Sequence, residues 1–311
     1  MEAFGTIVNK VAVMLVMIVL GYVITRRGIL TQRGAGEITS LLLKIVTPCL
    51  IVNSLLSSEG DLTAGEMLLG LGLALLSLGI GVAVSYLFFR REPPDRKKVL
   101  RFSLIFSNAG FMGIPLVQSI VGGRGVVYGS LFIVAFNLVC WTYGYAMMTG
   151  GGKLNLRTAL LNPGIIGLAI GLPLYFLRVP LPSVVLEPVG FLAGLNTPLA
   201  MLVIGSHVAR VDLRSSLLDL SVYKLSFLRL LLVPGLYLLT LLLIRPEPDL
   251  FLSSVIQASA PVAANCVLFA VEYGGNASLA SRTVAVSTVL SILTIPLMTV
   301  LAQWACTGFP G

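Results

Sequence analysis

The chain has 311 residues, of which 57% are hydrophobic and only 11% are charged. Soluble domains carry about 25% charged residues, so this composition excludes an ordinary soluble enzyme and predicts a single integral membrane domain of the all-α class. The formal net charge of +8 lies in short loops between apolar segments. Charge in such loops indicates membrane topology, and we therefore expect no nucleic-acid partner.

Ten apolar segments, each roughly 20 residues long, are long enough to cross a bilayer as helices. The predicted spans, numbered one to ten, cover residues 5–25, 38–57, 66–89, 100–121, 126–148, 159–178, 186–209, 221–244, 250–273 and 279–303. Lys and Arg concentrate in the loops that follow odd-numbered spans, and the loop after span two is acidic. By the positive-inside rule, the odd-numbered loops are cytoplasmic and both termini lie outside the plasma membrane.

The fourth span contains the segment Ser107-Asn108-Ala-Gly110-Phe-Met-Gly113-Ile-Pro115-Leu. We expect a broken helix here, because Pro115 lacks a backbone donor and its ring clashes with the preceding turn. Hydrocarbon tolerates a break only where protein or a water-filled cavity satisfies the freed backbone groups. A break at mid-membrane beside Asn108 therefore indicates a binding site. The alternative is a tolerated kink, since Pro and Gly are common in membrane helices.

The two halves of the chain share sequence features in the same order, about 150 residues apart. The pairs are Thr47-Pro48 with Thr197-Pro198, Ser107 and the break at Pro115 with Ser259-Ala-Pro261, Gly122-Gly123 with Gly274-Gly275, and Asn9 with Asn162. A repeat of five spans, 1–152 and 153–311, places its copies in the membrane with opposite orientation. Secondary transporters use this duplication and bind substrate where discontinuous helices meet. The repeat thus favours a site over a kink.

The same motifs resemble the auxin efflux carrier family, which includes plant PIN-type exporters and bacterial transporters assigned to malonate, malate and related organic anions. Asn108 to Leu116 is similar to the family's fourth-helix signature, and Val255 to Pro261 with Phe269 to Tyr273 is similar to its ninth helix. Asn137-Leu-Val-Cys-Trp141 in span five is similar too. The resemblance covers essentially the whole chain.

This resemblance implies ten transmembrane helices arranged as two inverted five-helix repeats, a fold shared with bile-acid/sodium symporters. Helices 4 and 9 are then broken and cross beside the substrate. Helices 1, 2, 6 and 7 form a scaffold, helices 3–5 and 8–10 form a transport domain that moves like an elevator, and the protein is a homodimer. Span three lacks the Asp and Lys of the plant exporters, and the second span has Asn53 and Ser54 where they have serines. Proton coupling and an auxin-shaped site are therefore not carried over.

Broken helices also predict the charge of the substrate. Where Pro115 and Pro261 interrupt their spans, each following half-helix presents unpaired N–H groups and a partial positive dipole end. Two such ends meeting at the midplane favour an anion. A carboxylate could then be held without a buried Arg or Lys, which is costly in a membrane.

The candidate substrate-binding residues lie on these breaks and on two neighbouring motifs. They are Asn108, Gly110, Gly113, Pro115, Asn137, Trp141, Pro261, Asn265, Thr47 and Thr197. The amides of Asn108 and Asn265 can donate and accept hydrogen bonds, although helix–helix contact is the alternative. Asn137 and Trp141 lie one turn apart and share a helix face, where Trp141 serves either substrate or packing.

Other polar residues have a structural role as the stronger alternative. Thr47 and Thr197 precede prolines, where their hydroxyls repair the interrupted backbone. Glu272 at the end of span nine is a candidate for binding a coupling ion, or simply an interfacial carboxylate. The four cysteines and the single histidine form no metal spacing, and we expect no metal site and no cofactor other than a coupling ion, H⁺ or Na⁺.

These patterns favour a secondary transporter that carries a small organic anion, such as a carboxylate or an auxin-like acid, across the plasma membrane. We expect alternating access of the elevator type, with substrate at the crossing of helices 4 and 9 and lipid around the protein. The alternatives are a sodium-coupled transporter like the bile-acid symporters and an anion channel on the same scaffold. An intramembrane enzyme is disfavoured because the chain has no HExxH motif, no paired membrane aspartates and no serine–histidine pair at suggestive spacing.

Overall fold

The computed structural model describes residues 2–57, 62–151, 163–210 and 219–306, and within them nearly all of the backbone is helical. The α-helices are α1 (Glu2–Arg26), α2 (Gln32–Leu41), α3 (Thr47–Leu56), α4 (Ala64–Phe88), α5 (Pro94–Ile105), α6 (Ile114–Ile120), α7 (Gly123–Val139), α8 (Tyr145–Thr149), α10 (Pro163–Phe176), α11 (Ser183–Gly194), α12 (Asn196–Ala209), α14 (Leu220–Phe227), α15 (Val233–Ile244), α16 (Pro248–Ser259), α17 (Asn265–Glu272) and α18 (Ala277–Cys306). Four π-helical turns join some of them, namely η1 (Leu42–Val46), η2 (Ala109–Gly113), η3 (Cys140–Gly144) and η4 (Leu228–Leu232).

Six continuous helical stretches among the described residues are long and apolar enough to cross a membrane. They are Gln32–Leu56, Ala64–Phe88, Gly123–Thr149, Ser183–Ser206, Leu220–Ile244 and Ala277–Cys306. They correspond to predicted spans two, three, five, seven, eight and ten, which confirms the all-helical membrane class. Predicted span one lies within helix α1 (Glu2–Arg26), spans four and nine are interrupted, and part of span six with Asn162 lies outside the described residues. The total of ten spans remains a prediction.

Three of the π turns stand directly before a proline step. Pro48, Pro115 and Pro234 each lie at the start of the α-helix that follows η1, η2 or η4. A proline in a helix lacks the N–H and clashes with the carbonyl four residues earlier, and the wider π turn gives that carbonyl room. Helical backbone therefore runs from Ala109 to Ile120 through Pro115, and the prediction that Pro115 breaks span four is wrong.

The break in span four lies earlier, between α5 and η2. Helix α5 ends at Ile105, and Phe106 has the extended angles φ −99° and ψ 113°. In span nine the break falls where it was predicted: α16 ends at Ser259, and Ala260, the residue before Pro261, is extended with φ −63° and ψ 148°. A residue before proline is biased to this conformation by the proline ring.

The two breaks lie against each other and pair. Ser107 and Val262 form an antiparallel β-bridge. The Asn108 N–H donates to the carbonyl of Pro261 at 2.7 Å, and the Ala263 N–H donates to the carbonyl of Phe106 at 3.0 Å. The broken spans four and nine thus cross at their breaks, and each supplies partners for backbone groups that the other's break sets free.

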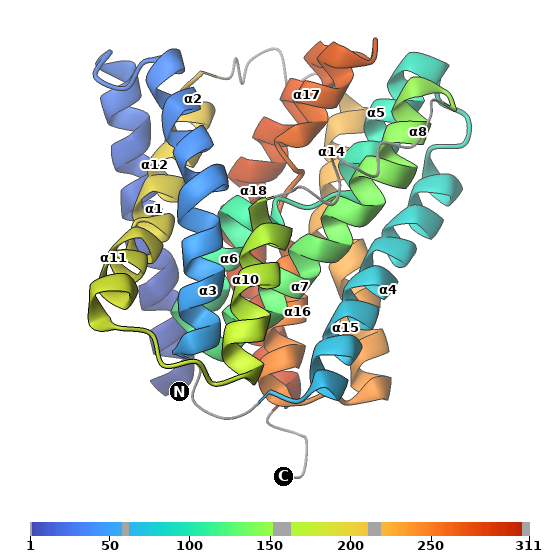
Figure 1. Ribbon diagram of the computed structural model, residues 1–311. Coiled ribbons are helices and arrows are strands. Elements are labelled where there is room, and N and C mark those ends of the chain that lie inside the picture. The colour runs from blue at the N-terminus through green and yellow to red at the C-terminus, as the bar shows by residue number, and fades with distance from the viewer. Residues whose placement is uncertain (1, 58–61, 152–162, 211–218, 307–311) are drawn as a thin grey trace.

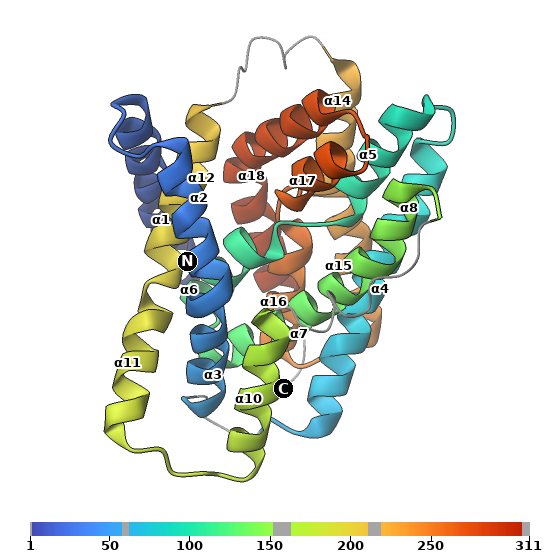
Figure 2. The same ribbon diagram turned by 45° about the horizontal axis from the view of Figure 1, so that its top comes forward.

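Around the crossing the helices form two groups. Helices α1, α2, α3, α11 and α12 lie on one side with α10 beside them, and α4, α5, α7, α8 and α14 to α18 lie on the other (Figures 1 and 2). Glycines allow backbone contact within the first group. A Cβ atom at Gly205 of α12 would lie 2.0 Å from the Ile18 carbonyl oxygen of α1, and one at Gly167 of α10 would lie 2.9 Å from the Pro48 Cα of α3. This group therefore packs closely along the pairs α1–α12 and α3–α10.

Candidate functional site

The two candidate asparagines lie at equivalent places on either side of the crossing. Asn108 immediately precedes η2, and its carbonyl accepts hydrogen bonds from the N–H groups of Met112 (3.1 Å) and Gly113 (3.3 Å). Asn265 is the first residue of α17. Both residues are half-buried. In the first turn of α17 the N–H groups of Cys266 and Val267 donate to the carbonyls of Ala263 and Ala264. Each half-helix thus begins with an amide side chain next to the paired breaks, at the end where the helix dipole is positive.

The central cation of the crossing is Arg229 of η4, which the sequence analysis did not single out. Its side chain is only 2% exposed. The guanidinium donates from Nε to the Ala260 carbonyl at 3.2 Å, from Nη1 to the Leu104 carbonyl at 3.0 Å and from Nη2 to the Ala258 carbonyl at 2.6 Å. Arg229 therefore binds the ends of both α5 and α16. The sequence reasoning had considered helix ends alone, and it did not include a buried cation at this place.

A second buried polar group at this place is Gln257 in the last turn of α16. Its side chain is 0% exposed, and neither Oε1 nor Nε2 has a hydrogen-bond partner among the described residues. The amide lies between two glycines: a Cβ atom would be 1.7 Å from Oε1 at Gly113 and 2.5 Å from Nε2 at Gly129. Buried amides without partners are rare and costly, which marks Gln257 as a candidate functional residue.

Both residues left a signal in the sequence. Arg229 is the second of two cations in the apolar span 221–244, five residues further into the span than Lys224, and an ionisable residue within a membrane span is a functional candidate by default. Gln257 lies within the quoted ninth-helix motif, four residues before Pro261. What the sequence could not supply was the tertiary contact that brings η4 to the ends of α5 and α16.

Hydroxyl groups line the side of the crossing next to α18. The Val262 N–H donates to Ser287 Oγ at 3.1 Å. Ser103 Oγ lies 3.0 Å from Cys266 Sγ and 3.2 Å from Thr283 Oγ1, all of them buried. The buried hydroxyl of Ser107, in the break itself, has no partner among the described residues. The crossing is thus a polar spot inside an otherwise apolar core.

Trp141 is connected to the crossing through aromatic rings. Its ring centroid lies 5.0 Å from that of Phe269 in α17, which lies 4.9 Å from Phe102, and Phe102 lies 4.5 Å from Phe106 in the break. Asn137 is buried, and its Nδ2 donates to the Ile133 carbonyl at 2.9 Å in the same helix. The structure thus gives Trp141 a packing contact, and its role at the substrate remains a prediction, as does that of Asn137.

The two threonines lie apart from the paired breaks. Thr47 Oγ1 donates to the Leu42 carbonyl at 2.9 Å, across the π turn η1, which is the backbone repair expected of it. Thr197 Oγ1 of α12 donates to Gln118 Oε1 of α6 at 3.3 Å, so this hydroxyl joins α12 to the second half of span four. Their role in binding substrate remains a prediction.

The remaining candidates differ in what surrounds them. A Cβ atom at Gly110 would meet nothing within 4 Å, whereas the amide of Gln257 occupies the space where a Cβ atom of Gly113 would lie. Pro261 lies in the break, and Pro115 lies in the helix that follows the other break. Glu272 is exposed at the last residue of α17, seven residues and roughly 10 Å along the helix from Asn265.

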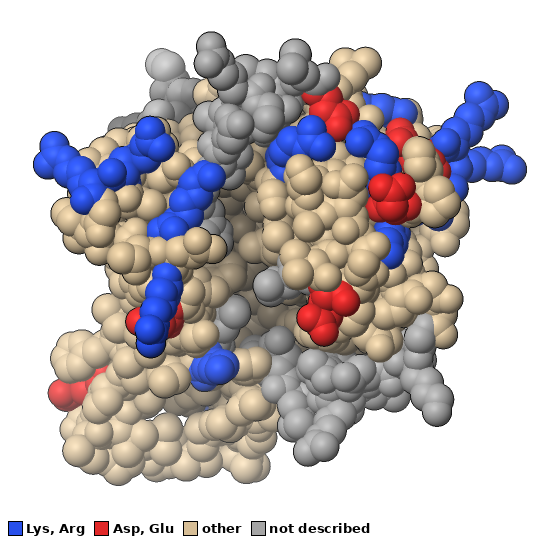
Figure 3. Space-filling model, turned by 90° about the horizontal axis from the view of Figure 1, so that it is seen from above, with Lys and Arg blue, Asp and Glu red and all other residues tan. Residues whose placement is uncertain are grey.

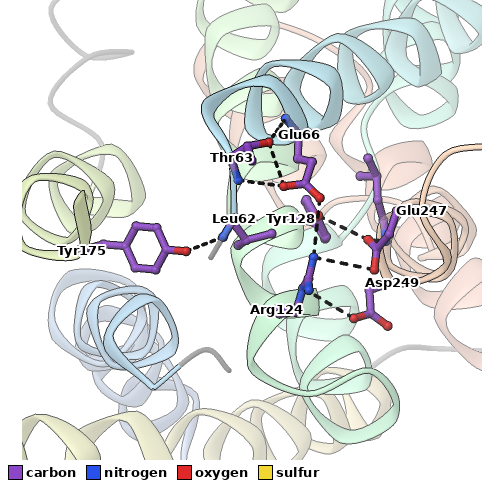
Figure 4. Close-up of polar contacts among 9 residues, drawn as sticks. Leu62, Thr63, Glu66, Arg124, Tyr128, Tyr175, Glu247 and Asp249 are labelled. Carbon is purple, nitrogen blue, oxygen red and sulfur yellow. Dashed lines mark hydrogen bonds and ion pairs between the residues drawn. The ribbon is translucent and has the colours of Figure 1, made fainter. Parts of the chain in front are cut away.

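A separate ionic cluster joins the starts of α4, α7 and α16 (Figure 4). Arg124 lies 3.7 Å from Glu66, 3.7 Å from Glu247 and 3.8 Å from Asp249, and Tyr128 donates to Glu247 at 3.3 Å. Next to it, the N–H of Leu62 donates to the Tyr175 hydroxyl of α10. The cluster fixes three helices at the end of the molecule opposite the loops that follow α1 and α4. In the described residues, no group of acidic, His and Cys side chains could hold a metal ion.

An all-helical apolar fold with a polar crossing of two broken helices defines an integral membrane protein of the transporter class. The sequence profile of the family described as "Membrane transport protein" matches residues 6–155 and again residues 151–299. The chain therefore belongs to this family, which is the auxin efflux carrier family.

Two relatives match over nearly their whole length. An "Uncharacterized transporter" of Methanothermobacter thermautotrophicus is 26% identical over 292 residues, which cover 92% of this chain and 95% of the relative. A "Putative malonate transporter" of Rhizobium meliloti is 24% identical over 292 residues, covering 90% of each. Both relatives are thus named as transporters.

Proposed function

We propose that this membrane transporter is a secondary carrier for a small organic anion, with the substrate bound at the crossing of spans four and nine. The observation that supports the proposal is the pairing of the two breaks, because it joins the segment that leads into η2 at Asn108 to the segment that leads into α17 at Asn265. Discontinuous helices that meet inside a membrane are the usual binding site of such carriers. A carboxylate is the substrate class that we favour, and the relative named for malonate supports it.

The proposal includes an inverted repeat of two five-span halves. The family profile matches each half once. If spans one to five correspond to spans six to ten, the contact of span one with span seven is the counterpart of the contact of span six with span two. Both contacts exist, as α1–α12 and α10–α3, and both are made close by glycine. The antiparallel pairing of the two breaks has the same symmetry.

We further propose that transport moves one helix group against the other. The group of spans one, two, six and seven would be the scaffold, and the other six spans would carry the crossing. Between them lies a mostly apolar interface, in which Met14 and Ile18 of α1 face Met112, Leu116 and Ile295 around a cavity of about 30 Å³. Apolar contacts are non-directional, so such an interface can shift without losing hydrogen bonds, and the Thr197–Gln118 contact is a polar exception.

The orientation follows from loop charge. Lys and Arg side chains gather at the end of the molecule seen in Figure 3, and we propose that this end is cytoplasmic, with both termini on the outer side of the plasma membrane. From the family resemblance we also propose that the protein is a homodimer and that transport is coupled to an ion, H⁺ or Na⁺.

The test is transport by the purified protein in liposomes. Loaded vesicles are given radiolabelled malonate, malate, acetate or indoleacetate, with and without a sodium or proton gradient. We expect saturable uptake of at least one acid and faster uptake when the same acid is present inside. Uptake that never saturates and shows no trans-stimulation would instead indicate a channel, and no uptake of any acid above empty liposomes would refute the proposal.

A further inference from the structure

The crossing brings together four helix ends whose partial charges oppose one another. Two are amino-terminal, at η2 and α17, and two are carboxy-terminal, at α5 and α16. Each end corresponds to about half an elementary charge, positive at an amino terminus and negative at a carboxy terminus. The four contributions therefore sum to about zero. Paired broken helices alone give this site no preference for an anion over a cation or a neutral molecule.

Arg229 breaks this balance. Its guanidinium donates to the carbonyls of Leu104, Ala258 and Ala260, at distances from 2.6 to 3.2 Å. Leu104 lies in the last turn of α5, and Ala258 and Ala260 lie at the end of α16. The positive charge is thus fixed on both carboxy-terminal ends and on neither amino-terminal end. Adding one full charge to the four half-charges leaves about one net positive charge at the crossing.

This charge has no carboxylate partner within the part of the chain that the structure describes. The side chain is 2% exposed, and the three contacts of its guanidinium are all with neutral carbonyl groups. A buried charge without a counter-ion is destabilising by several kcal/mol in general. Such a charge attracts any anion that reaches the region, because the interior screens it weakly.

The geometry points to Arg229 as the residue that determines anion selectivity at the crossing, by neutralising both carboxy-terminal helix ends so that the amino-terminal ends attract one carboxylate group. This inference rests on the proposed function. Arg229 acts through the helix ends, and we describe it as a positioning residue. A lysine would retain the charge but offers three donors on one atom, whereas the planar guanidinium reaches three carbonyls on two helices.

The test compares a carboxylate with its amide, which has nearly the same shape and no charge. Wild-type protein in liposomes is given each acid of the panel above, and the amide of the transported acid is added as competitor. The variants are Arg229→Gln, which removes the charge, and Arg229→Lys, which keeps it. Lys224→Gln is the matched control, because Lys224 is an exposed cation in the same span, on α14.

We expect Arg229→Gln to raise the KM for the acid about tenfold or more, equivalent to at least 1.4 kcal/mol, while inhibition by the amide stays unchanged. Arg229→Lys should keep the preference for acid over amide, even where its turnover is slower, and Lys224→Gln should behave as wild type. A purely structural role would lower turnover and thermal stability but leave the ratio of acid to amide affinity unchanged.

Three results separate the possibilities. If wild-type protein transports no acid, the proposed function fails and the inference falls with it. If wild-type protein transports an acid and folded Arg229→Gln keeps the same acid-to-amide ratio, the inference alone is overturned. If Arg229→Gln does not fold, Arg229→Lys decides: a retained preference for the acid supports the inference, and a lost preference in folded protein overturns it.

Discussion

The position of the Gln257 amide between Gly113 and Gly129 predicts different effects on stability for alanine at Gly113 and at Gly110, two glycines of the π turn η2. Gly113→Ala would place a Cβ atom 1.7 Å from Gln257 Oε1. Gly129 limits where the amide can move, because a Cβ atom there would lie 2.5 Å from Nε2. Gly110→Ala in the same turn would meet nothing within 4 Å and serves as the matched control.

The expected size follows from two opposing effects. Overpacking a tight core costs about 1–3 kcal/mol, and replacing a helical glycine by alanine returns about 1 kcal/mol. Gly113→Ala should therefore lower the free energy of unfolding by up to about 2 kcal/mol, whereas Gly110→Ala should raise it by up to about 1 kcal/mol. Removing the amide in the double variant Gly113→Ala/Gln257→Ala should abolish the clash, with a coupling energy of about 1–2 kcal/mol.

The assay is thermal and denaturant unfolding of the purified variants in one detergent, followed by circular dichroism. All variants must first show the helical content of the wild type at low temperature. Equal stability of Gly113→Ala and Gly110→Ala would show that the amide is not held between the two glycines. Additive effects in the double variant would lead to the same conclusion.

Three further predictions concern single side chains. Asn108→Ala should raise the KM for the transported acid about tenfold with folding intact, and a wild-type KM would remove Asn108 from the site. Thr47→Val loses one backbone contact and should cost about 1 kcal/mol of stability without changing KM, so a changed KM would place the hydroxyl at the substrate. Burial raises the pKa of the Asp219 carboxyl. Hydrogen bonds from Arg96 and the Ser221 N–H, together with the charges of Arg96 and Arg282, outweigh this effect, and the pKa of Asp219 lies below its usual value. A lowered carboxyl pKa stabilises the fold above the unfolded-state value of about 4, and this contribution is lost as pH falls through the folded-state pKa. The Tm should therefore drop on acidification below about pH 4, and Asp219→Asn, which can still cap α14, should flatten that drop.

Much of the fold follows from sequence because its signals are local. Apolar length predicts the spans, and the stretches 64–88, 220–244 and 277–306 match their predictions closely. Pro261 predicts its break because the residue before a proline is pushed out of the helical region. The crossing was predicted through the repeat and the family resemblance, and the pairing of Ser107 with Val262 agrees with it.

The wrong prediction at Pro115 and the two missed residues have one physical origin: contacts between segments that are distant in the sequence decide them. Pro115 is a helix breaker by local rules, but the π turn η2 accommodates it, and the break falls at Phe106 to Asn108 instead. No local rule specifies that choice. Arg229 and Gln257 have their meaning only through contacts with segments far away in the chain, and a pattern of helical spacing contains no information about such contacts.

The two hydrogen bonds between the breaks also limit how the protein can open. In hydrocarbon an unsatisfied backbone group costs several kcal/mol, so pulling Asn108 away from Pro261 and Ala263 away from Phe106 would be prohibitive without water. Halves that swing apart like a clamshell at this point would have to sever both bonds in every cycle. In the proposed transport cycle the crossed segments therefore travel as one piece, and the barriers that close the pathway on either side would come from the surfaces past which that piece slides.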